Sequence, residues 1–100
     1  MSKSQFLILL EPAALDDIKS AINYYDEVQI GLGKKFEREL NSCFISLEKA
    51  PFYSIRYEEV FCLPMTKFPF MIHYSINEGS FQLVVRAVLH TSLNPDMWKR

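Results

Sequence analysis

The chain has 100 residues, of which 49% are hydrophobic and 23% are charged, so we expect a single globular domain over residues 1–100. The formal net charge of −1 disfavours a dedicated nucleic-acid-binding protein, because such proteins usually carry a clear basic excess. The two cysteines, Cys43 and Cys62, lie far apart and form no zinc-binding pattern, so we expect neither metal nor cofactor. We recognise no secretory leader and no membrane-spanning run, and the expected compartment is the cytoplasm.

The first half of the chain predicts one strand followed by two helices. The apolar run over residues 5–10 is typical of a buried strand. Pro12 suits the first turn of a helix, and Asp16 and Asp17 follow near the N-terminus of that helix, where negative charge is favoured. Two apolar stripes then recur at helical spacing: Leu15, Ile18, Ile22 and Tyr25, and Leu32, Phe36, Leu40, Cys43, Phe44 and Leu47. Because the segment between them is short, the two helices should form an antiparallel hairpin.

After Pro51 the pattern changes to that of strands. Residues 53–63 are rich in aromatic and β-branched side chains, and we expect a bulge or bend at Glu58 and Glu59 and a strand end at Pro64. Two further strands should form a hairpin that turns over residues 77–79. If Ile76 pairs with Phe81, every facing pair is apolar: Tyr74 with Leu83, Ile72 with Val85, Phe70 with Ala87, and Phe68 with Leu89.

That register assigns the polar residues of the hairpin to the opposite face of the sheet, which is left for solvent or a partner. The expected neighbours on this face are Met71 with Arg86, His73 with Val84, and His90 with Lys67. The helical hairpin should cover the apolar face. The order strand, helix, helix, strand, strand, strand therefore predicts an α+β fold, with a helical hairpin on one face of a mainly antiparallel four-stranded sheet.

Short motifs occur in a fixed order along almost the whole chain. They are Ala13, Ala14, Asp16, Asp17 and Ile18, then Tyr24 and Tyr25, then Leu32, Gly33, Phe36, Leu47 and Pro51, then Phe68, Pro69, Phe70 and Tyr74, and finally Arg86, His90, Asn94, Pro95 and Trp98. Their order and spacing resemble the ParE/RelE toxin superfamily of type II toxin–antitoxin systems, which includes plasmid stabilisation proteins. The resemblance implies a small cytoplasmic toxin that a small antitoxin neutralises. ParE-like members inhibit DNA gyrase without known chemistry, whereas RelE-like members cleave messenger RNA in the ribosome.

Three positions bear on the choice between these branches. The resemblance implies that a nuclease commonly carries an arginine three residues before Tyr74, and this chain has Met71 there. Nucleases also commonly close the last strand with a pair of histidines or tyrosines, and here His90 is followed by Thr91. ParE-like sequences often carry an arginine at the position of Leu93. One cation and one proton-transfer group of the nuclease pattern are therefore missing, which favours the ParE-like branch and a protein that is not an enzyme.

His90 and Arg86 are nevertheless the candidate catalytic residues. His90 could act as a general acid or base, or it could be a strand-end histidine that orders the tail by hydrogen bonding. Arg86 could anchor a phosphate or an antitoxin carboxylate, or it could pair with an acidic side chain of the chain itself. The candidate residues for binding an antitoxin or target are Arg86, His90, Met71, His73, Met97 and Trp98.

Two further groups could contact a partner. Met97 and Trp98 follow a proline in the tail and are of the kind found at interfaces, although Trp98 could instead cover the sheet edge. Lys34, Lys35 and Arg38 form a basic cluster on the second helix, either a solvated face or a surface that attracts an acidic antitoxin or target.

The resulting hypothesis is a toxin that acts by protein binding, with DNA gyrase as its target and a small antitoxin as its immediate partner. A dimer or a toxin–antitoxin heterotetramer is the expected assembly, and no membrane is involved. Two alternatives stay open. One is a ribosome-dependent mRNA endoribonuclease that uses His90 and Arg86, and the other is a degenerate, non-toxic member of the superfamily.

Overall fold

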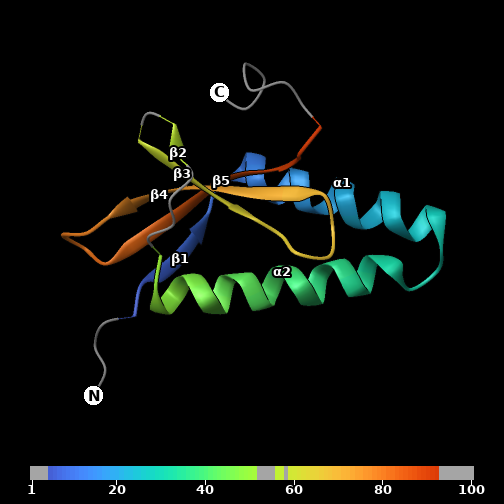
Figure 1. Ribbon diagram of the computed structural model, residues 1–100, viewed down its shortest axis with the longest axis horizontal. Coiled ribbons are helices and arrows are strands. Elements are labelled where there is room, and N and C mark those ends of the chain that lie inside the picture. The colour runs from blue at the N-terminus through green and yellow to red at the C-terminus, as the bar shows by residue number, and fades with distance from the viewer. Residues whose placement is uncertain (1–4, 52–55, 58, 93–100) are drawn as a thin grey trace.

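The computed structural model describes residues 5–51, 56–57 and 59–92 (Figure 1). Leu93, Met97 and Trp98, and Glu58 of the expected bend, lie outside the described residues. The elements in chain order are β1 (Leu7–Leu10), α1 (Pro12–Val28), α2 (Leu32–Lys49), β2 (Arg56–Tyr57), β3 (Val60–Pro64), β4 (Phe70–Asn77) and β5 (Gln82–His90). The two helices lie together on one side of the sheet, as Figure 1 shows. The predicted α+β fold and the order of its main elements are confirmed.

Helix α1 begins at Pro12, as predicted, because proline has no N–H that the first turn would leave without an acceptor. Three residues of its predicted apolar stripe pack against the core, but Leu15 is 41% exposed. The buried positions of α1 belong instead to Ala14 and Ala21. These small side chains let the helix backbone approach the sheet closely, which hydrophobicity alone does not reveal.

The predicted apolar stripe of α2 is confirmed. Phe36, Leu40 and Leu47 are buried in the core, and Cys43 and Phe44 are partly buried against it. The stripe repeats every three to four residues, as expected for a helix with one face on a core. Helix α2 therefore turns this stripe towards the core.

Two glycines shape the connection between the antiparallel helices. Gly31 has a φ of 92°, a left-handed conformation in which a Cβ would be strained. Gly33 is buried at the helix crossing, where an added Cβ would lie 2.6 Å from the carbonyl oxygen of Ile22. The backbone N–H of Gly33 also donates to Asp26 Oδ1 at 2.9 Å. The crossing of α1 and α2 therefore depends on the absence of a side chain at residue 33.

The strands form one sheet in the order β1-β5-β4-β3-β2, with β1 parallel to β5 and the other pairs antiparallel. The expected strand over 53–63 is not continuous. Its first part supplies the two-residue β2, which pairs back on β3, and β3 ends at Pro64 as predicted. The predicted four strands are therefore present, with a short fifth strand at the edge.

The predicted register of the last hairpin is wrong by two residues at the turn. Phe81 belongs to the turn, with a φ of 53°, so β5 begins only at Gln82. Ile76 therefore faces Leu83 rather than Phe81, and Tyr74 faces Val85. A shift of two residues preserves the alternation of faces, so these apolar side chains still point to the helices.

A β-bulge changes the alternation farther along the hairpin. Tyr74 pairs with Val85 but His73 pairs with Ala87, which leaves Arg86 as the extra residue of β5. Beyond the bulge, Val88 takes the core position that the predicted register gave to Ala87. His90 likewise moves to the helix-facing side, opposite Phe70.

The second face of the sheet also differs from the prediction. His73 faces Ala87 and not Val84, and Met71 faces Leu89 and not Arg86. His73 is fully buried and its Nδ1 lies 3.4 Å from the thiol of Cys62. The centre of this face is therefore part of the interior rather than a surface left for solvent. No helix among the described residues is both long and apolar enough to cross a bilayer.

Candidate functional site

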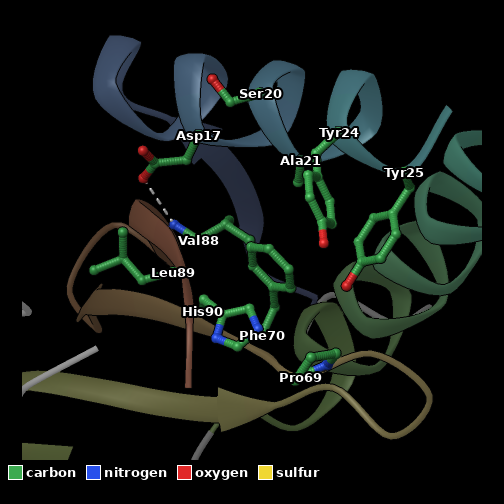
Figure 2. A pocket seen from close by; sticks show the side chains of 10 residues that line it. All are labelled: Asp17, Ser20, Ala21, Tyr24, Tyr25, Pro69, Phe70, Val88, Leu89 and His90. Atoms are coloured by element: carbon green, nitrogen blue, oxygen red, sulfur yellow. Dashed lines mark hydrogen bonds between the residues drawn. The ribbon is translucent and has the colours of Figure 1, made fainter. Parts of the chain in front are cut away.

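A groove lies between α1 and the C-terminal half of β5, and its volume is about 450 Å³ (Figure 2). It exists because β1 pairs with β5 only as far as Val85, whereas β5 continues to His90. Beyond that point α1 is the neighbour of β5, and its small Ala21 leaves room beside the strand. We call this feature the α1–β5 groove.

Asp17 connects α1 to the edge of β5 at one end of this groove. Its Oδ2 accepts a hydrogen bond of 3.0 Å from the backbone N–H of Val88 (Figure 2). Asp16 and Asp17 were expected to favour the helix N-terminus, but neither lies in the first turn of α1. Asp17 instead satisfies a donor on the open edge of β5, which would otherwise be available to another strand.

Aromatic side chains form the walls of the groove. Tyr24 and Tyr25 extend from α1 towards Phe70 and Pro69, as Figure 2 shows. The two tyrosines divide between surface and core, since Tyr24 is 59% exposed and Tyr25 packs on Phe68 at 4.9 Å between ring centroids. Partial burial, with a smaller contribution from Tyr24, raises the pKa of the Tyr25 hydroxyl. Tyr25 therefore stays a neutral hydrogen-bonding phenol at physiological pH.

His90 lies on the floor of the α1–β5 groove, with its ring 5.2 Å from that of Phe70. Its Nδ1 accepts the backbone N–H of Ser92 at 3.1 Å and lies 2.7 Å from the Ser92 hydroxyl. Because a backbone N–H can only donate, Nδ1 of the neutral ring must be the acceptor and Nε2 must carry the hydrogen. The basic lone pair of His90 is therefore already engaged, and His90 offers the groove a donor.

Arg86 lies on the other face of the sheet from His90. Its guanidinium pairs with Glu11, at 3.3 Å from Nε to Oε1, and contacts the Ser75 hydroxyl at 3.4 Å. Both Arg86 and Glu11 side chains are more than 40% exposed, so the pair contributes little to stability. Pairing with an acidic side chain of the same chain is thus observed, and the binding of a phosphate or an antitoxin carboxylate by Arg86 stays a prediction.

Of the other predicted site residues, His73 and Met71 are described by the structure and do not line this groove. His73 is buried beside Cys62 and cannot contact a partner without rearrangement, so its prediction as a surface residue is wrong. Met71 is half-buried on the same face, opposite Leu89. Among the described residues no group of three or more metal-ligating side chains comes together.

The groove can accommodate an apolar or aromatic side chain with a polar edge. Its walls are rings and short aliphatic groups, and its polar groups are the tyrosine hydroxyls, the Nε2–H of His90, and the side chains of Asp17 and Ser20 at one end. The sequence indicated His90 as a site residue, but neither the two tyrosines nor Asp17 as part of the same site. The only signal for Asp17 was an acidic residue placed past the first helical turn, which is too common to predict such a contact.

Comparison with solved structures places this fold among bacterial and archaeal toxins. The chromosomal ParDE system of P. aeruginosa gives a TM-score of 0.74 at 12% identity, covering 90% of this chain and 100% of the other. The intact E. coli RelBE toxin–antitoxin complex gives 0.67 at 11% identity, covering 88% and 99%. The RelE–RelB complex of Pyrococcus horikoshii gives 0.58 at 13% identity, covering 90% and 99%.

Comparisons of the sequence itself found nothing: no family model and no curated protein matches this chain. At identities of 10–14% the structural likeness establishes the architecture and leaves the activity to be argued from the site. The chain has the fold of the ParE/RelE toxin superfamily.

Proposed function

We propose that this chain is the toxin of a type II toxin–antitoxin system and that it acts by binding a protein. Its target is DNA gyrase, and a small antitoxin neutralises it in the cytoplasm. The fold supports this proposal, because the neighbouring structures are described as toxin–antitoxin complexes of ParDE and RelBE type. The geometry of His90 supports binding over catalysis and carries the proposal.

Cleavage of RNA needs a base for the 2′-hydroxyl and a cation on the same phosphate, both within hydrogen-bond reach of the reacting atoms. The lone pair of His90 is engaged by Ser92, and protonating Nδ1 would break the hydrogen bond from the Ser92 backbone. Arg86, which would supply the cation, lies on the opposite face of the sheet and pairs with Glu11. The two candidate catalytic groups therefore cannot act together on one phosphate in this arrangement.

The same groove is well suited to protein binding. Tyr24 is a large, exposed, amphipathic side chain on a rigid helix, the type of residue that most often dominates an interface. Beside it lie an apolar hollow and the Nε2–H donor of His90. A partner side chain inserted here would bury apolar area and keep a hydrogen bond, so we assign the α1–β5 groove to target binding.

A supercoiling assay with purified gyrase tests this proposal, run beside a primer-extension assay on ribosomes programmed with messenger RNA. The expected result is inhibited supercoiling with intact message. Tyr24→Ala should weaken the inhibition about fivefold or more, as truncation of an interface anchor does. The matched control Ile45→Ala removes another exposed side chain, on α2 and outside the groove, and should leave inhibition unchanged. Message cleavage without an effect on gyrase would contradict the proposal.

A ribosome-dependent endoribonuclease is the second candidate, since His90 lies in a groove with two tyrosine hydroxyls that could replace the missing groups. In that case His90→Ala should abolish message cleavage while circular dichroism shows an intact fold. If neither gyrase nor message is affected, the chain is a non-toxic member of the superfamily.

A further inference from the structure

A second cavity, of about 760 Å³, lies between α2 and the loop that joins β3 to β4. Lys35 and Arg38 line it from the helix, and Lys67 lines it from the loop. We call this feature the basic groove. The structure divides the cluster predicted from the sequence, because Lys34 lines a different cavity, near Asp26 and outside the basic groove.

Glu39 supplies a carboxylate to the basic groove, and this carboxylate accepts hydrogen bonds from the loop between β3 and β4. Its Oε2 accepts the backbone N–H and the hydroxyl of Thr66, both at 2.6 Å, and its two oxygens share the backbone N–H of Lys67 at 3.0 Å. Burial acts to raise the pKa of Glu39, but these hydrogen bonds and the charge of Lys67 outweigh it, so the pKa is lowered. Glu39 is therefore ionised and engaged with the loop backbone.

Glu39 offsets only part of the positive charge that lines the basic groove. None of Lys35, Arg38 and Lys67 forms an ion pair within the described part of the chain. Lys35 and Arg38 are three residues apart on one helix face, where like charges repel and destabilise the helix slightly. With Glu39 included, three positive charges stand against one negative charge, in a protein whose total charge is −1.

We propose that the basic groove binds an acidic, extended segment of a partner protein. Carboxylates of such a segment would pair with Lys35, Arg38 and Lys67. The aliphatic stems of its side chains would lie against Leu32 and Phe68, which form the apolar part of the same groove. Charge complementarity of this kind increases the rate of encounter and sets the orientation of the partner.

Two features favour a peptide over a nucleic acid. The chain carries no basic excess that would attract a polyanion from a distance. Phe68 is half-buried against Tyr25 and Phe36, so only part of its ring is open to a stacking base. Identifying the acidic segment with the antitoxin rests on the proposed function, whereas binding of an acidic peptide does not.

Fluorescence anisotropy with a labelled peptide that alternates glutamate and leucine tests this inference directly. The same peptide with glutamine in place of glutamate measures the contribution of charge. We expect the glutamate peptide to bind more tightly than the glutamine peptide. Lys35→Gln combined with Arg38→Gln should raise its dissociation constant about tenfold, roughly threefold for each cation. Lys34→Gln, which removes the same charge from the neighbouring residue, should change the constant by less than about twofold.

Three results would overturn the inference. One is an equal loss for Lys34→Gln, which would mean non-specific attraction. Another is the absence of a difference between the two peptides. The third is tighter binding of labelled oligouridylate than of the acidic peptide, which would assign the groove to RNA. Because none of these readouts uses toxicity, failure here and failure of the proposed function are distinguishable.

Discussion

Replacing Gly33 by alanine should weaken the fold, because the two helices cross where residue 33 has no side chain. An alanine Cβ would lie 2.6 Å from the carbonyl oxygen of Ile22 and 2.8 Å from the carboxyl group of Asp26. Real Cβ contacts are essentially never shorter than 3.0 Å. The Asp26 side chain can rotate away, but the Ile22 oxygen belongs to the backbone of α1. Alanine at this position would therefore push the helices apart.

The size of this effect follows from three terms. Overpacking of this kind costs about 1–3 kcal/mol. Rotation of Asp26 also breaks its 2.9 Å hydrogen bond from the Gly33 N–H, worth about 1 kcal/mol. The better helix propensity of alanine returns up to about 1 kcal/mol. We expect a net loss of roughly 1–3 kcal/mol, or a fall in Tm of about 5–20 °C for a domain of this size.

Urea denaturation followed by circular dichroism measures the loss for Gly33→Ala. Gly79→Ala is the matched control, because its Cβ would meet only Asn77 Oδ1 at an ordinary 3.5 Å and should change stability by less than about 0.5 kcal/mol. Combining Gly33→Ala with Asp26→Ala removes the side-chain clash but keeps the contact with Ile22. If Gly33→Ala is as stable as the wild type, the account of the helix crossing is wrong.

Three other perturbations test the core and the sheet edge. Tyr74→Phe should cost about 1–2 kcal/mol in urea denaturation, because it removes the buried hydrogen bond of 2.6 Å from the Tyr74 hydroxyl to the carbonyl of Pro51; an unchanged midpoint would contradict this. Asp17→Ala should speed hydrogen exchange of the Val88 amide, because it removes the acceptor of that N–H. An unaltered exchange rate would show that Asp17 does not protect the edge of β5. Burial raises the pKa of the Cys62 thiol from 9.0 to about 11, so the unfolded state loses its proton first. Stability should therefore hold below pH 9, and the Cys62 thiol should contribute a fall of roughly 2–3 kcal/mol as the pH rises towards 11. In Cys62→Ala the fall measured by denaturation should be smaller by that amount, and an equal fall in both proteins would contradict this assignment.

The sequence predicts the order of helices and strands well, because the spacing of apolar residues follows which face of each element is buried. The apolar stripe of α2 is found as predicted. Helix α1 begins at Pro12 and strand β3 ends at Pro64, as the sequence predicts. In α1 the stripe is displaced towards Ala14 and Ala21, since close packing selects small side chains that hydropathy ranks poorly. Local sequence patterns are therefore sufficient to predict an element that buries one face against the core.

The arrangement of the candidate site is harder to predict, because it depends on the pairing of two strands. The turn takes in Phe81 with a left-handed φ, and the bulge at Arg86 reverses the faces beyond it. One inserted residue exchanges the faces of the β5 residues that follow it, which brings His90 to the helices. No feature of the residues themselves indicates a bulge at Arg86, so the separation of Arg86 from His90 became visible only in three dimensions.

The central claim is that this chain binds a target protein and does not cut RNA. Pulse labelling of DNA and protein synthesis after induced expression in bacteria tests that claim most directly, with Tyr24→Ala as the groove variant. We predict that DNA synthesis falls first with the wild-type chain and that Tyr24→Ala delays the fall. If protein synthesis falls first, with cleaved messenger RNA, the claim is contradicted and the groove around His90 is a catalytic site.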